Sequence, residues 1–273
     1  MSGPWGGGRW AWVLGLVLLV GCPEGQRRPE STAPPAATLL EALHARAGVV
    51  RSLSAELRLE VWRGDERVKL RQLVAVDGVD RLRVDSLSPF GQPISTLAAR
   101  DGRLAIYDLQ THRFYEGRAT PENLARLLPI RLEPGEIGAL LRGTVPVLAH
   151  QRATASHDAE RDVDVLVLEG PAGRQTVDFE RGGHRVVETR VHRDGQLRYV
   201  ARLGRYDGPE AQATPRRVRF TAPEGEGELR VDIEVLEHRI NPTLPDEAFT
   251  LDAPRGIPVE SLDAEAPPPH LAP

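Results

Sequence analysis

Hydrophobic and polar residues alternate over most of this chain, and short turn dipeptides separate the alternating stretches. In residues 53–61 every second side chain is apolar and the ones between are mostly polar or charged. Side chains of a β-strand point alternately to its two faces, so this pattern predicts a strand with one apolar and one solvated face. Gly-Asp at 64–65 and Asp-Gly at 77–78 and 101–102 are typical of the turns in β-hairpins.

Further alternating runs predict strands along the rest of the chain. The expected strands lie at residues 68–76, 82–84, 94–99, 104–109, 112–116, 163–167, 177–179, 187–191, 197–203, 218–220 and 229–235. In residues 68–76 the alternation is interrupted by a phase shift near Gln72 and Leu73. In residues 163–167 the valines alternate with aspartates, which predicts that the valines form the apolar face and Asp162 and Asp164 the polar one.

Three segments have helical spacing instead. Residues 38–50 form an amphipathic pattern with Thr38 as the expected N-cap. Residues 121–128 and the segment from 134 to 141 each begin with proline, which is favoured at the first helical position. Roughly ten or eleven short antiparallel strands with these helices predict a mainly β (α+β) domain, in which helices cover the concave face of a single strongly curved antiparallel sheet. The pattern leaves open whether that face is filled by side chains or holds a ligand.

The N-terminal segment contains the only cysteine, Cys22, directly after an apolar run at residues 10–20. That run follows one positive residue, Arg9, and is too short to span a bilayer but has the length of a signal-peptide core. The residues before the cysteine, Leu19-Val20-Gly21, resemble the bacterial lipobox, in which the thiol is acylated and becomes the mature N-terminus. We therefore expect a lipidated Cys22; an ordinary secretory signal with an unrelated cysteine nearby is the alternative.

This interpretation divides the chain into four parts. Residues 1–21 are expected to be a lipoprotein signal peptide that is removed. Residues 22–37 are polar and proline-rich and predict a flexible tether between the lipidated cysteine and the domain. Residues 38–251 carry the expected strands and helices, and residues 252–273 are expected to form a disordered tail.

Composition argues against several classes of function. The chain has 40% apolar and 27% charged residues, an ordinary globular balance, and its net charge of −4 gives no basic footprint for nucleic acid. A single cysteine allows no intramolecular disulfide. The densest group of potential metal ligands fits no known ligand spacing and is interpreted as solvated charges: His150, His157, Asp158, Asp162 and Asp164. No catalytic motif is present, so we expect no enzyme, metal or cofactor.

Short motifs at residues 84–146 resemble the outer-membrane lipoprotein receptor family LolB. In that family a strand runs into a Pro-Leu-Gly turn, where this chain has Pro-Phe-Gly at 89–91. Two short helices follow and end in Gly-x-Pro; here the sequence is Gly-Thr-Val-Pro at 143–146, one residue longer. Residues 241–251 are more similar to the wider LolA/LolB superfamily, which includes uncharacterised DUF4292-type lipoproteins.

The resemblance implies an incomplete β-barrel whose hydrophobic cavity accepts acyl chains of lipoproteins or other lipids, at the outer membrane and facing the periplasm. A periplasmic carrier is then a possible partner. In the family the apolar residue of the turn protrudes and is linked to delivering cargo into the membrane; Phe90 takes that place, and packing of Phe90 into the core is the alternative. The expected cavity-lining residues, each also compatible with ordinary core, are Leu57, Leu59, Val61, Leu82, Val84, Ile106, Val165, Val167, Val177 and Phe179.

Three functions are compatible with these observations. The first is carriage or reception of lipids and lipoproteins. The second is a non-catalytic envelope sensor, or a scaffold of a lipid-export machine, with a filled cavity. The third is an unrecognised hydrolase, for which His157 and Asp164 are the residues to test.

Overall fold

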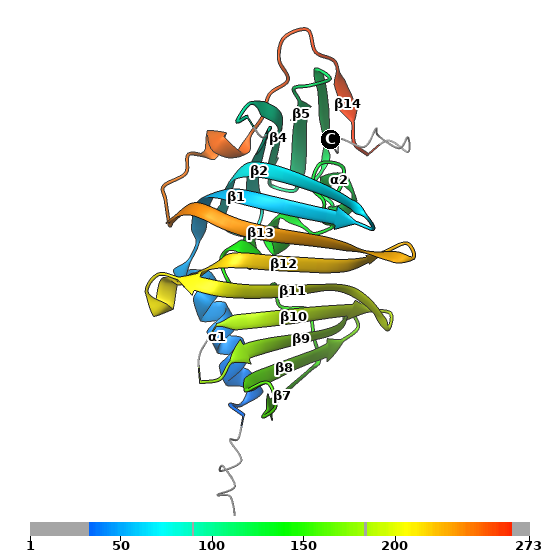
Figure 1. Cartoon of the computed structure of the whole chain (residues 1–273). Helices are drawn as coiled ribbons and strands as arrows, with labels where there is room; N and C mark the ends of the chain where they lie inside the picture. Colours follow the sequence, from blue (N-terminus) through cyan, green and yellow to red (C-terminus); the bar gives the residue numbers. More distant parts are fainter. Residues whose placement is uncertain (1–32, 89, 183–184, 264–273) are drawn as a thin grey trace, which may run out of the picture. The chain divides into compact units, whose positions relative to one another are not determined.

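One sheet dominates the computed structural model, which describes residues 33–88, 90–182 and 185–263, all within a single unit of the chain (Figure 1). Its strands in the described residues are β1 Ser52–Arg63, β2 Glu66–Asp77, β3 Arg81–Leu87, β4 Pro93–Arg100, β5 Arg103–Asp108, β6 Arg113–Arg118, β7 Arg152–Asp158, β8 Val163–Gly170, β9 Gly173–Glu180, β10 Val186–Arg193, β11 Gln196–Asp207, β12 Thr214–Glu224, β13 Gly227–Ile240 and β14 Val259–Ser261. The strand order is β14-β6-β5-β4-β3-β2-β1-β13-β12-β11-β10-β9-β8-β7. Two antiparallel meanders, β1–β6 and β7–β13, are thus joined where β1 pairs with β13.

The helices are short. They are α1 Ala36–Val49, α2 Pro121–Leu124 and α3 Pro134–Leu141, with 3-10 turns η1 Glu210–Gln212 and η2 Asp246–Phe249. The side chain of Thr120 accepts a hydrogen bond from the Asn123 N–H at 3.2 Å and so caps α2, which ends at Leu124 rather than at residue 128 as predicted. The front helix starts at Ala36 rather than after Thr38, and Thr38 lies inside it. In the described part of the chain, no helix is long and apolar enough to cross a membrane.

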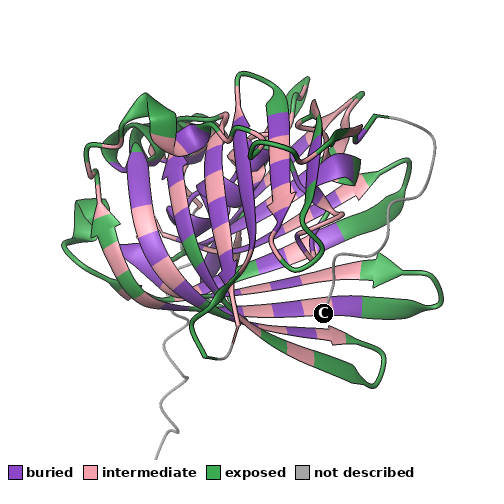
Figure 2. Ribbon diagram, turned by 90° about the horizontal axis from the view of Figure 1, so that it is seen from above, coloured by how far each residue is buried: buried purple, intermediate pink, exposed green. Residues whose placement is uncertain are grey.

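Helices and sheet share one hydrophobic core on the concave face of the sheet. Leu39 and Leu43 of α1 and Leu140 of α3 pack in the same cluster as the buried residues of the strands. Buried and exposed residues alternate along most strands (Figure 2), as period-two patterning requires. The prediction of one curved sheet with helices on one face is therefore confirmed, with β14, which runs parallel to β6, as an exception to antiparallel pairing.

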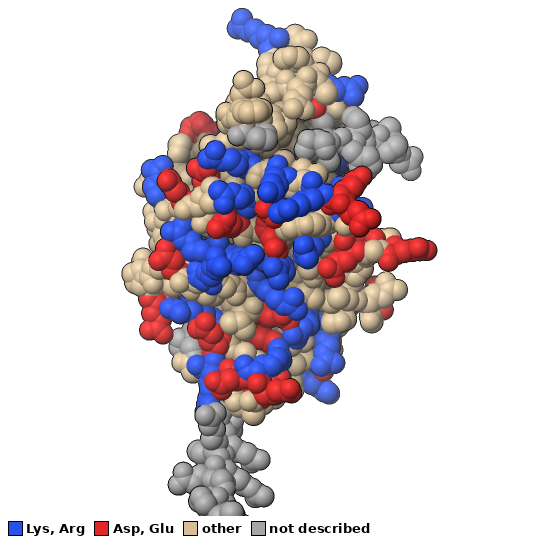
Figure 3. Space-filling model, viewed as in Figure 1, with Lys and Arg blue, Asp and Glu red and all other residues tan. Residues whose placement is uncertain are grey.

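The convex face is charged. Positively charged arginines and negatively charged carboxylates intermix over it (Figure 3). Many of them pair across strands, as in Arg58–Glu234 at 2.7 Å and Arg219–Asp232 at 2.6 Å. Exposed pairs of this kind contribute little stability. Their main consequence is that this face is well solvated, except where Phe249 of η2, 2% exposed, lies over β3 and β4.

Three further differences from the sequence-based expectations concern β7, β2 and the C-terminal segment. Residues 152–158, for which no strand is expected from the sequence, form strand β7. Strand β2 has no phase shift: it pairs in continuous register with β1 and β3, and Gln72 is a buried polar residue on the core-facing side. The expected C-terminal tail is part of the domain as far as residue 263, because β14 joins the sheet and Leu262 is buried.

Candidate functional site

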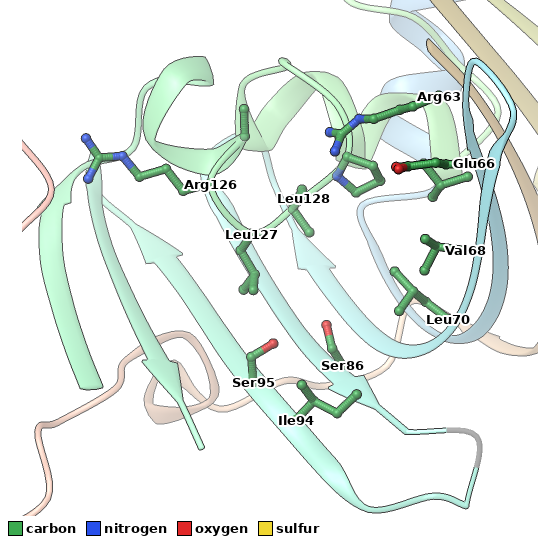
Figure 4. A pocket seen from close by; sticks show the side chains of 13 residues that line it. Arg63, Glu66, Val68, Leu70, Ser86, Ile94, Ser95, Arg126, Leu127 and Leu128 are labelled. Atoms are coloured by element: carbon green, nitrogen blue, oxygen red, sulfur yellow. The ribbon is translucent and has the colours of Figure 1, made fainter. Parts of the chain in front are cut away.

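A cavity of about 110 Å³ lies on the concave face, between the sheet and the segment that follows α2 (Figure 4). Strands β1 and β2 supply one wall, β3 and β4 the floor, and residues 125–129 the roof. The lining residues are Val61, Arg63, Glu66, Val68, Leu70, Ser86, Ile94, Ser95, Ala125, Arg126, Leu127, Leu128 and Pro129.

The lining is apolar inside and charged at the rim. Leu127 and Leu128 point from the roof towards the sheet, where Val68 and Leu70 lie, whereas Arg126 points away (Figure 4). Arg63 at the rim is half exposed and pairs with Glu224 at 3.3 Å. A hydrocarbon group fits the interior of such a cavity, and a polar group fits its rim.

A row of polar residues crosses four strands, and its two middle members, Ser86 and Ser95, line the floor of the cavity. Gln72, Ser86, Ser95 and Asp108 stand opposite one another on β2, β3, β4 and β5, and each is 6% exposed or less. The amide of Gln72 donates to Ser86 Oγ at 3.2 Å. Asp108 accepts from the backbone of the β5–β6 turn. Ser86 and Ser95 therefore mark the line on the concave face where the packed core ends and the cavity begins.

The roof is held over the sheet by side chains alone. The N–H groups of Arg126, Leu127 and Leu128 donate to carbonyls of Asn123 and Leu124. Within the described residues, no backbone hydrogen bond joins residues 125–129 to a strand. Lifting the roof would therefore expose apolar surface but would break no strand pairing.

The β3–β4 hairpin, whose stem forms the cavity floor, carries Phe90 at its tip. Phe90 is 91% exposed, so in this structure it does not pack into the core. Ser88 organises the turn: its Oγ accepts from the N–H groups of Phe90 at 3.2 Å and Gln92 at 3.1 Å. Gly91 has φ +81°, a conformation that glycine adopts without strain. The turn thus holds an aromatic ring in solvent beside an apolar cavity.

Comparison with known proteins identifies the fold of this chain. No protein-family model matches the chain, and no curated protein matches it. Among solved structures, a LolA superfamily protein from Nitrosomonas europaea is similar at 16% identity with a TM-score of 0.58, over 80% of this chain and 99% of that one. A DUF1329 family protein from Desulfovibrio piger is similar at 14% identity and TM-score 0.58, over 79% and 97%. A putative outer membrane lipoprotein-sorting protein domain from Vibrio parahaemolyticus matches at 12% identity and TM-score 0.54, over 78% and 97%.

This chain has the LolA/LolB-like fold. Eight of the ten expected cavity-lining residues lie in the core cluster: Leu57, Leu59, Val61, Leu82, Val84, Ile106, Val177 and Phe179. Of the ten, Val61 alone lines the cavity beneath residues 125–129. The remaining floor and roof residues were missed, because neither the registry of the strands nor the return of residues 125–129 over the sheet is visible in the sequence.

Strand β8 has the opposite phase to the one expected. Leu166 and Leu168 belong to the core cluster, so Val165 and Val167 point to the convex face of the LolA/LolB-like sheet. Asp164 shares the inner face and is 4% exposed. The expectation that the valines face a cavity and Asp164 faces solvent is wrong, because the run is apolar on both faces and either phase fits it.

Two residues of the group interpreted from the sequence as solvated charges, His157 and Asp164, do come together. His157 Nδ1 lies 3.0 Å from Asp164 Oδ1, and His157 Nε2 lies 3.8 Å from Asp162 Oδ1. The ring of His150 instead contacts the Leu148 carbonyl at 2.8 Å. In the described residues, no group of three or more such side chains is arranged to hold a metal ion. Cys22 lies outside the described residues.

Proposed function

We propose that this chain is a membrane-anchored lipoprotein that binds acyl chains between its sheet and residues 125–129, and that carries or receives lipoproteins or lipids at the outer membrane. The LolA/LolB-like fold and the lipobox-like residues before Cys22 support this role. The neighbour from Vibrio parahaemolyticus is described as a lipoprotein-sorting domain. The observation that carries the proposal is the exposed Phe90 on the hairpin whose stem floors the cavity. The role needs no catalytic group.

Shielding is the physical task of such a protein. An acyl chain of about 15 methylenes carries on the order of 12 kcal/mol of hydrophobic cost in water, so it does not cross an aqueous compartment unshielded. The cavity of about 110 Å³ is smaller than the ~150 Å³ that holds a benzene molecule, and well below the ~300–1,000 Å³ of ordinary ligand pockets. An acyl chain therefore enters only if the roof lifts and the chain replaces Leu127 and Leu128 against the sheet.

Phe90 gives the cavity a way to meet a bilayer. Transfer of an exposed phenylalanine side chain into lipid contributes roughly 1.5 to 3 kcal/mol. Because the stem of the same hairpin forms the cavity floor, insertion of Phe90 would bring the opening to the membrane surface. In this proposal a periplasmic carrier delivers the cargo, Cys22 anchors the receiver, and the hairpin passes the acyl chain on.

Transfer of a fluorescent acylated peptide from the full chain to vesicles tests this proposal. Phe90→Glu is expected to retain cargo binding and lose transfer. Val79→Glu is the matched control, because Val79 is 78% exposed on the β2–β3 turn at the other end of these strands. Wild-type transfer by Phe90→Glu, or equal loss in both variants, would contradict the proposed role of Phe90.

A second candidate function follows from the packing of the core. The concave face is largely filled by its own side chains, which favours a sensor or scaffold whose cavity stays closed. Mass spectrometry of lipid that co-purifies with the chain separates the two: a bound lipid supports carriage, and its absence together with no binding of the acylated peptide supports the scaffold.

A further inference from the structure

The two edges of the sheet end differently. The β6 edge is covered: β14 pairs with it, Leu262 N–H donates to the Glu116 carbonyl at 2.7 Å, and the Leu262 side chain is 1% exposed. Asp263 then accepts from Asn123 Nδ2 at 2.8 Å. At the opposite end, β7 pairs with β8, and within the described residues no other strand pairs with it.

Strand β7 contacts helix α1 but lacks several features that commonly protect an edge. Residues 152–158 contain no proline, lysine or glycine, and their register with β8 is unbroken. Arg152, Thr154 and Ser156 are exposed on the convex side, and the alternate residues Ala153 and Ala155 are small. Backbone groups of alternate residues in such an edge point away from the sheet without partners, which makes it a template for another strand.

The order of residues on β7 indicates which strand would pair with it. Around Ala155 the strand is chemically palindromic: when it is laid antiparallel on itself with Ala155 on the two-fold axis, Arg152 stands opposite Asp158 and Thr154 opposite Ser156. A hydroxyl pair then forms twice on the convex face, and each Arg152 comes beside an Asp158 that already accepts from Arg161 Nε of its own chain at 2.7 Å. Both kinds of cross-strand pair are favourable, by about 0.2–1 kcal/mol each. A two-fold axis requires such self-complementarity, because the same surface meets itself.

We propose that β7 is a dimerisation edge, at which a second copy of this chain adds its own β7 and extends the sheet across a two-fold axis at Ala155. A strand of unrelated sequence would satisfy only the backbone groups. A second copy also matches the side chains on the convex face. The pairing is small beside the ~1,600 Å² of a standard interface, so association depends on protein concentration. This inference does not rest on the acyl-chain role.

Cysteine cross-linking of the full chain tests the axis. Residues opposite each other in an antiparallel pair have Cα atoms about 4.5 or 5.5 Å apart, within the range that a disulfide spans. Ala155→Cys is therefore expected to give a disulfide-linked dimer on a non-reducing gel. Val259→Cys, exposed at 52% on β14, is the control, and the parent chain reports any background from Cys22. If Ala155→Cys gives no more dimer than Val259→Cys, the proposal is overturned.

A charge pair on the exposed face tests the register independently. In the Ala155→Cys background, Thr154→Lys with Ser156→Lys places like charges opposite each other twice, whereas Thr154→Lys with Ser156→Glu places opposite charges there. We expect about tenfold less cross-linked dimer in the first variant than in the second, from two cross-strand pairs that change sign. Equal cross-linking in both variants refutes the two-fold register, even if both fold normally.

Discussion

A substitution at Leu128 can separate the effect of cavity size on acyl-chain binding from its effect on stability. It is 5% exposed, belongs to the core cluster and lines the roof of the cavity. Leu128→Ala removes a side chain that already borders empty space. We expect the free energy of unfolding to fall by about 2 to 3 kcal/mol, the lower part of the range for buried leucine, because the site is incompletely packed to begin with.

The same substitution enlarges the cavity. The space vacated by the leucine side chain joins the existing 110 Å³, which brings the total past the ~150 Å³ that admits a benzene-sized molecule. It also removes one of the two leucines that hold the roof down. Affinity for a fluorescent fatty acid is therefore expected to increase, and a titration of the full chain measures it alongside urea unfolding.

Leu124→Ala is the matched control. Leu124 is 0% exposed on α2 and does not line the cavity, so its replacement should destabilise the fold at least as much without improving binding. Ser95→Leu, which fills the floor, should reduce binding. If Leu128→Ala binds fatty acid no better than the parent chain while remaining folded, the idea that this cavity is the entry point for acyl chains is wrong.

Three further outcomes concern the domain that carries the cavity. Burial raises the pKa of Glu136, so the stability that its protonated carboxyl contributes is lost as pH rises through the folded pKa. Glu136→Gln can still accept from the Glu133 N–H. This variant should have a higher melting temperature than the parent chain at pH 7, and its melting temperature should fall less between pH 4 and 7. A Cβ on Gly117 would lie 2.6 Å from Leu262 Cβ, so Gly117→Ala should displace β14, seen as faster proteolysis of the C-terminal segment. Arg46, 6% exposed, donates to two backbone carbonyls; Arg46→Met should cost about 3 kcal/mol in urea unfolding, since two charge-assisted hydrogen bonds are lost, and Arg46→Lys should cost less.

The strands that were predicted well are those with one buried face. In β1 the alternation of residues 53–61 is complete, because one side meets the core and the other meets water. Strand β8 has apolar residues on both faces, so the sequence supports either phase, and the predicted phase is wrong. Strand β7 was missed because its inward residues, Ala153 and Ala155, are too small to give a hydrophobic signal.

Contacts between distant residues account for the other differences. The pairing of β14 with β6 joins residues 259–261 to 114–116, and a three-residue strand without apolar alternation has no local signature. The short 3-10 turn η2 likewise covers the convex face through Phe249, a residue whose burial depends on strands β3 and β4. Such elements are fixed by tertiary packing, which composition and periodicity do not encode.

The cavity did leave a trace in the sequence, in polar residues that occupy apolar positions of a strand. Gln72, Ser86 and Ser95 each fall in the core-facing phase of β2, β3 or β4. On β2 the glutamine interrupts the apolar alternation of the sequence, although the phase continues through it. A single buried polar residue is ambiguous, because core residues can satisfy one another, as Gln72 and Ser86 do. Only the register aligns the three side chains into one row, and that row marks where close packing of the LolA/LolB-like sheet stops.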